Sequence, residues 1–140
     1  MTRIRRHVWI GLIPILVSCA YFEPAAAHQL DLTGTSWKAV SIDGEPLDPE
    51  VLVAFPDLSS VIVGEGCLQY RADLALDTDG SAIGFGEFEP VAPNPCPSSP
   101  AITAAGDLIG ALAGAEEWRV DGDRVDITGA HDVVLARRRT

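Results

Sequence analysis

Residues 67–76 read Cys-Leu-Gln-Tyr-Arg-Ala-Asp-Leu-Ala-Leu and carry the clearest pattern in the chain. Apolar side chains occupy every second position of this stretch: Leu68, Tyr70, Ala72, Leu74 and Leu76. Successive side chains of a β-strand point to opposite faces, so this period predicts a strand with one face against a core. The stretch therefore indicates a β-rich domain.

Shorter strand patterns lie on both sides of it. Alternating or continuous apolar runs predict strands at residues 37–42, 51–55, 61–63, 82–91, 118–120, 125–127 and 133–136. Turn signals separate them at Asp43-Gly44, Asp79-Gly80 and Asp121-Gly122-Asp123. The predicted elements show no regular alternation of strand and helix, which favours antiparallel pairing over a parallel sheet.

One helix is predicted after Pro97. Ser99 can cap it, Pro100 suits its first turn and Gly114 can end it. A single apolar stripe follows at three- and four-residue spacing: Ala101, Ala104, Ala105, Leu108, Ile109 and Leu112. The order strands, helix, strands predicts an α+β domain, a small antiparallel β-rich fold with a curved or barrel-like sheet and one packed helix.

The first residues are expected to direct export. Three arginines precede residues 8–17, an apolar stretch of ten residues, whereas a spanning helix needs about 20. Leu16-Val17-Ser18-Cys19 resembles a bacterial lipobox, and Ala25-Ala26-Ala27 resembles an ordinary signal-peptidase site. The first is preferred because Cys19 directly follows the apolar stretch.

The resulting organisation is a lipoprotein-type signal peptide at 1–18, a tether at 19–31 and a domain at 32–137. Acyl chains of the palmitate kind on Cys19 would then hold the protein on the outer side of the cell membrane. The alternative is secretion after cleavage at Ala27. The pair Arg5-Arg6 weakly resembles a twin-arginine signal, with ordinary Sec export as the default.

The charge of the chain argues against nucleic acid as a partner. Three of the ten basic residues lie in the leader, which leaves seven against 20 acidic residues and a formal charge of −13 after cleavage. Phosphate binding needs a Lys/Arg face, and the basic run after the leader is residues 137–139 at the C-terminus. Acidity of this kind serves solubility.

Several short motifs resemble the META domain (HslJ-like) family over residues 32–137. They are Leu32-Thr33-Gly34-Thr35-Ser36-Trp37, Gly66-Cys67 with Tyr70, Cys96 before the helix, and Trp118-Arg119-Val120 leading into Val125-Asp126-Ile127. The resemblance implies a small antiparallel β-rich fold with one helix, often exported or lipid-anchored, linked to bacterial stress response and without an established enzymatic activity. Leu68 stands where the family usually has Asn, and residues 92–95 lack its usual Thr.

The cysteines predict a disulfide. With Cys19 lipidated, Cys67 and Cys96 form an even pair in an oxidising compartment, and two buried thiols are the alternative. Their bond would close a loop of about 29 residues and contribute about 3 to 4 kcal/mol through chain entropy. Zinc is disfavoured because no further Cys or His completes a four-ligand set.

No catalytic, metal or cofactor motif is recognised. The Asp-Gly segments at 77–80 and 121–123 read as turns rather than calcium loops. His131, like His28 in the tether, has no nucleophile motif beside it. Trp37, Tyr70 and Trp118 are a candidate ligand surface, although packing in the core or at its rim explains them more simply.

These observations favour a non-enzymatic envelope lipoprotein that binds or supports another envelope component, with an envelope protein as the candidate partner. The alternative is a carrier of a small apolar ligand inside a barrel-like cavity lined by Phe55, Phe85 and Trp118. A hydrolase is a distant third and requires His131 within hydrogen-bond reach of a nucleophile.

Overall fold

The computed structural model describes residues 11, 32–77, 81–91 and 99–138. Its strands and helix are β1 Thr35–Ile42, β2 Glu45–Asp57, β3 Ser60–Glu65, β4 Leu68–Leu76, β5 Ile83–Phe85, β6 Glu89–Pro90, α2 Pro100–Ala113, β7 Ala115–Asp121, β8 Arg124–Gly129 and β9 Val133–Arg137. Every pair of neighbouring strands is antiparallel. The α+β prediction with one packed helix is confirmed for the described residues.

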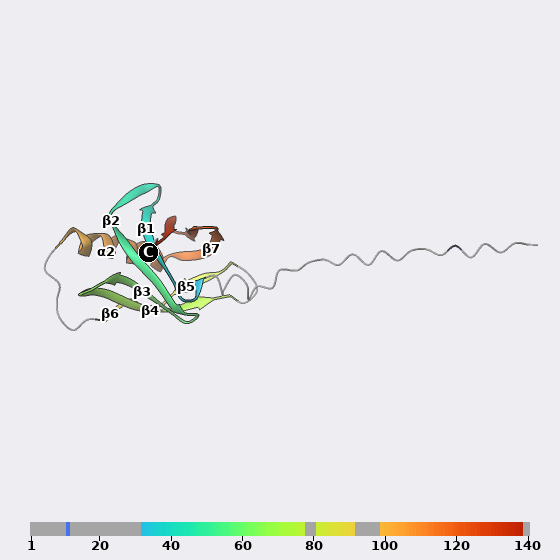
Figure 1. Ribbon diagram of the computed structural model, residues 1–140, viewed down its shortest axis with the longest axis horizontal. Coiled ribbons are helices and arrows are strands. Elements are labelled where there is room, and N and C mark those ends of the chain that lie inside the picture. The colour runs from blue at the N-terminus through green and yellow to red at the C-terminus, as the bar shows by residue number, and fades with distance from the viewer. Residues whose placement is uncertain (1–10, 12–31, 78–80, 92–98, 139–140) are drawn as a thin grey trace, which may run out of the picture.

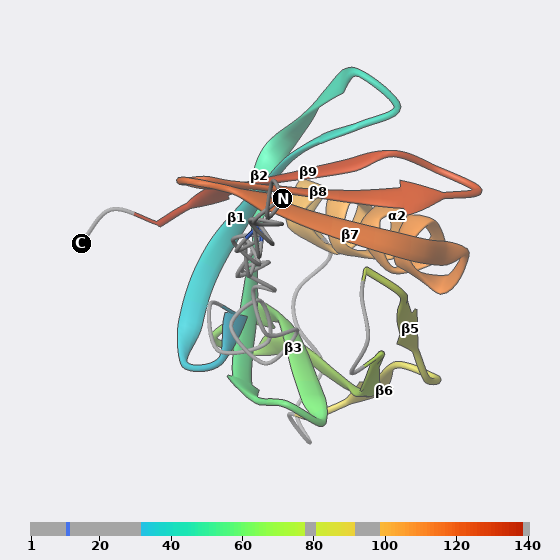
Figure 2. The same ribbon diagram turned by 90° about the vertical axis from the view of Figure 1, so that its right-hand side faces the viewer.

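The strands form a nearly closed, barrel-like sheet. Their order is β5-β4-β3-β2-β1-β9-β8-β7, with β6 paired to β4. The two ends of this order approach each other, because Ala82 bridges Glu117 and the amide of Trp118 donates to the carbonyl of Ser81 at 2.7 Å. Figure 2 shows β9, β8 and β7 side by side on one wall, with β3, β5 and β6 on the opposite wall.

The long strand β2 joins the two walls. It pairs with β1 through Thr35 and Phe55 at one end and through Ile42 and Glu45 at the other, and it also pairs with β3. Figure 1 shows it crossing the molecule from the β1 hairpin to β3. Prediction limited this strand to residues 51–55, because the polar segment from Glu45 to Glu50 has no apolar period.

The core fills the inside of the sheet. Side chains that are at most 1% exposed come from strands far apart in sequence, among them Trp37, Phe55, Val61, Ile127 and Leu135. Each lies on the inner face because it alternates with an outward neighbour, as Trp37 does with Lys38. Burying such apolar surface is the main favourable contribution to folding.

Helix α2 adds the last side of the core, packing chiefly against β2. Its predicted stripe is confirmed where Ala104, Ala105, Leu108 and Leu112 are buried. Ser99 occupies the N-cap position, but its side chain makes no capping hydrogen bond. In the described part of the chain, no helix has the length and apolar character needed to cross a membrane.

The expected strand at 82–91 is divided in two. Ile83–Phe85 pairs with the end of β4, whereas Glu89–Pro90 pairs nearer its start. Between them the amide of Gly86 donates to the carbonyl of Asp73 at 2.8 Å, outside the regular ladder. The glycines and Pro90 weaken strand pairing, so the prediction of one continuous strand is wrong.

The end of β3, where Gly64 pairs with Gln69 of β4, requires glycine at Gly64. Its φ is +96°, and an added Cβ would lie 1.9 Å from the carbonyl oxygen of Leu68. Gly66, two residues further on, also has a positive φ of +66° but has open space around it. Substitutions at the two glycines can therefore separate the cost of a positive φ, which applies to both, from the cost of a steric clash, which applies only to Gly64.

We expect Gly64→Ala to lower the free energy of unfolding by about 2 kcal/mol or more, because strain and a backbone clash add. Gly66→Ala is the matched control and should cost about 1 kcal/mol, since it meets only the unfavourable φ. Urea unfolding of both variants measures the difference. Equal losses would mean that the close approach of Leu68 carries no energetic penalty.

Candidate functional site

The predicted ligand surface does not form as one exposed patch. Trp37 is 0% exposed and Trp118 is 4% exposed, whereas Tyr70 is half-buried on β4. Both tryptophans belong to the core because strand alternation turns them inward. The candidate surface of Trp37, Tyr70 and Trp118 is therefore corrected, and the tryptophans have a packing role.

Trp37 also links the two ends of the described domain. Its indole N–H donates to the hydroxyl of Thr35 at 2.7 Å, and that hydroxyl donates to the carbonyl of Leu32. The Arg137 guanidinium carbon lies 5.4 Å from the centre of the Trp37 ring, a cation–π contact. Arg137 also lies 3.9 Å from a carboxylate oxygen of Asp123. The entry to β1 is thereby fixed to the end of β9.

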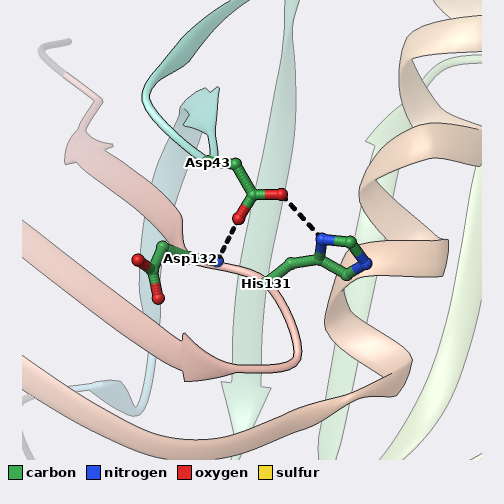
Figure 3. A network of polar contacts seen from close by, with 3 residues as sticks. All are labelled: Asp43, His131 and Asp132. Carbon is green, nitrogen blue, oxygen red and sulfur yellow. Dashed lines mark hydrogen bonds and ion pairs between the residues drawn. The ribbon is translucent and has the colours of Figure 1, made fainter.

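A polar cluster joins two turns at one end of the sheet. Asp43 lies in the β1–β2 turn, and His131 and Asp132 lie between β8 and β9 (Figure 3). One carboxylate oxygen of Asp43 lies 2.7 Å from Nδ1 of His131, and the other accepts the amide of Asp132 at 2.8 Å. The amide of Asp43 in turn donates to the carbonyl of Asp132 at 2.7 Å.

The predicted Asp43-Gly44 turn explains how this cluster forms. Both residues have positive φ, 51° for Asp43 and 79° for Gly44, as a two-residue hairpin turn requires. That conformation presents the Asp43 carboxylate to the neighbouring β8–β9 turn, since β1 pairs directly with β9. The cluster stabilises the contact between two hairpins.

The same geometry bears on the hydrolase hypothesis. His131 contacts a carboxylate, as the histidine of a triad does, but a nucleophile is also needed. Among the described residues, no serine or threonine hydroxyl is recorded as a hydrogen-bond partner of His131. His28 lies outside the described residues. The contact of His131 with Asp43 instead holds the β1–β2 turn against the β8–β9 turn.

We expect the contacts of Asp43 to make the thermal stability of the domain fall as the pH is lowered in the acid range. The amide of Asp132, and then the side chain of His131, lower the pKa of Asp43 below its usual 3.8. A carboxyl with a lowered folded pKa stabilises fully above its unfolded pKa, and this contribution disappears as the pH falls through the folded pKa. Asp43→Asn should therefore flatten the loss of thermal stability below about pH 4.

Asp57 provides a second, independent case of the same effect. The amide of Ser59, then the hydroxyls of Ser60 and Ser59, lower the pKa of Asp57 in the turn between β2 and β3. Asp57→Asn should flatten the same pH range independently, since the two turns are separate. A pH profile unchanged by Asp43→Asn would contradict the role assigned to the Asp43 cluster.

A groove of about 1010 Å³ lies on the outer face of β1, β9, β8 and β7. Its lining comprises Val40, Ser41, Gly44, Ser81, Glu117, Trp118, Arg119, Val120, Arg124, Asp126, Ile127, Thr128, Asp132, Val133 and Val134. Of the residues expected to line an inner cavity, Phe55 is buried in the core and Phe85 packs against it. Trp118 is buried in the core too, at 4% exposure, and also contributes to the lining of this groove. The interior position predicted for a ligand is thus occupied by side chains.

The groove was not predicted, although its apolar residues follow a visible pattern. Val40 and Val134 alternate with the buried Ala39, Val133 and Leu135, so both must point outward. The alternation of inward and outward residues along each strand could have identified Val40 and Val134 as outward-facing from the sequence. The pairing of β9 with β1, which brings the two valines onto one surface, depends on long-range contacts.

Cys67 is exposed and takes part in a disulfide. The other two cysteines, Cys19 and Cys96, lie outside the described residues, so pairing of Cys67 with Cys96 stays a prediction. A second hollow of about 420 Å³ lies beside Cys67, between the β3–β4 turn, β2 and the start of α2. Within the described ranges, no group of three potential metal ligands is found.

Comparison with known proteins identifies the fold and no function. No family model matches the chain, and no curated protein matches it. A crystal structure of a DUF4847 family protein from Bacteroides vulgatus is similar, with a TM-score of 0.58 and 12% identity over 81% of this chain and 99% of that one. An NMR structure of a protein from Burkholderia xenovorans has a TM-score of 0.55 and 15% identity, over 94% of this chain and 100% of that one.

Proposed function

We propose that this chain is an exported, lipid-anchored envelope protein whose domain binds or supports another envelope component without catalysing a reaction. The observation that carries the proposal is the disulfide at Cys67. Disulfides persist outside the cytoplasm and are rare within it, so this bond agrees with the export signal read at residues 1–18. The anchor itself is proposed from Cys19 in its lipobox-like setting.

The META-type resemblance adds a biological context. Its motifs extend over residues 32–137, and the resemblance implies a small antiparallel β-rich fold with one helix. A role in bacterial stress response is proposed on that resemblance alone. The acidic charge favours protein or small-molecule partners over nucleic acid.

Fractionation of cells tests the anchor. Wild-type protein should sediment with membranes and incorporate labelled palmitate, whereas Cys19→Ala should do neither. Mass spectrometry of the mature N-terminus separates the alternatives, because lipoprotein processing leaves acylated Cys19 and cleavage after Ala27 leaves His28. An unprocessed, soluble cytoplasmic protein would contradict export.

Chemical crosslinking in intact envelopes, followed by purification of the lipidated protein, tests the partner. A defined crosslinked species that disappears on substitution of surface residues would support binding of an envelope component. The carrier alternative is favoured by a different observation, the outer groove, which is the larger of the two hollows described above.

A further inference from the structure

We draw no further inference here: the strongest candidate, the outer groove on β1, β9, β8 and β7, carries none, because its two arginines share the lining with three acidic residues and nothing in the described residues shows what covers it.

Discussion

Replacing Trp37 by Ala should lower the free energy of unfolding by about 3 to 5 kcal/mol, the largest effect expected from a single substitution in this domain. The side chain is 0% exposed and lies on β1, between β2 and β9. Its removal leaves a cavity that the surrounding sheet can fill only in part. Small domains have total stabilities of about 5 to 15 kcal/mol, so much of the protein would unfold at moderate temperature.

The neighbouring Lys38 provides a matched control, because it lies next along β1 and points outward. Its ammonium is 3.8 Å from a carboxylate oxygen of Glu50, and both side chains are about half exposed. Exposed pairs of this kind contribute at most about 1 kcal/mol, so Lys38→Ala should change stability little. Urea unfolding followed by circular dichroism measures both variants. A small effect of Trp37→Ala would contradict its place at the centre of the core.

Replacing Cys67 by Ser should cost about 3 to 4 kcal/mol if its partner is Cys96, through the entropy that the bond removes from the unfolded chain. The bond would hold the β3–β4 turn close to the segment that precedes α2. The stabilisation acts mainly on the unfolded state, so the folded structure of the variant should stay close to that of the wild type.

Cys96→Ser and the double variant identify the partner. If Cys67 pairs with Cys96, both single variants and the double variant should lose the same stability, because either substitution removes one bond. Mass mapping of non-reduced peptides should then show a peptide containing Cys67 joined to one containing Cys96. Full stability in Cys96→Ser, or a Cys67–Cys19 peptide, would refute this pairing.

Most individual elements of the fold could be predicted from local sequence. The period of two in residues 68–76 gave β4, the apolar stripe at 101–112 gave α2, and Asp43-Gly44 gave the first hairpin turn. These features depend on side-chain alternation and backbone preferences within a few residues. Polar Glu45–Glu50 and the divided strand at 82–91 were missed because their pairing is decided by neighbouring strands rather than by their own pattern.

The candidate sites depended much more on the folded structure. Residue types alone could not join His131 to Asp43 across 88 positions, or bring Arg119, Asp126 and Arg124 into one groove with Val40 and Val134. Local sequence sets which way a side chain points from its strand. Which strands become neighbours is set by burial of apolar surface over the whole chain, and that long-range choice creates the groove and the cluster.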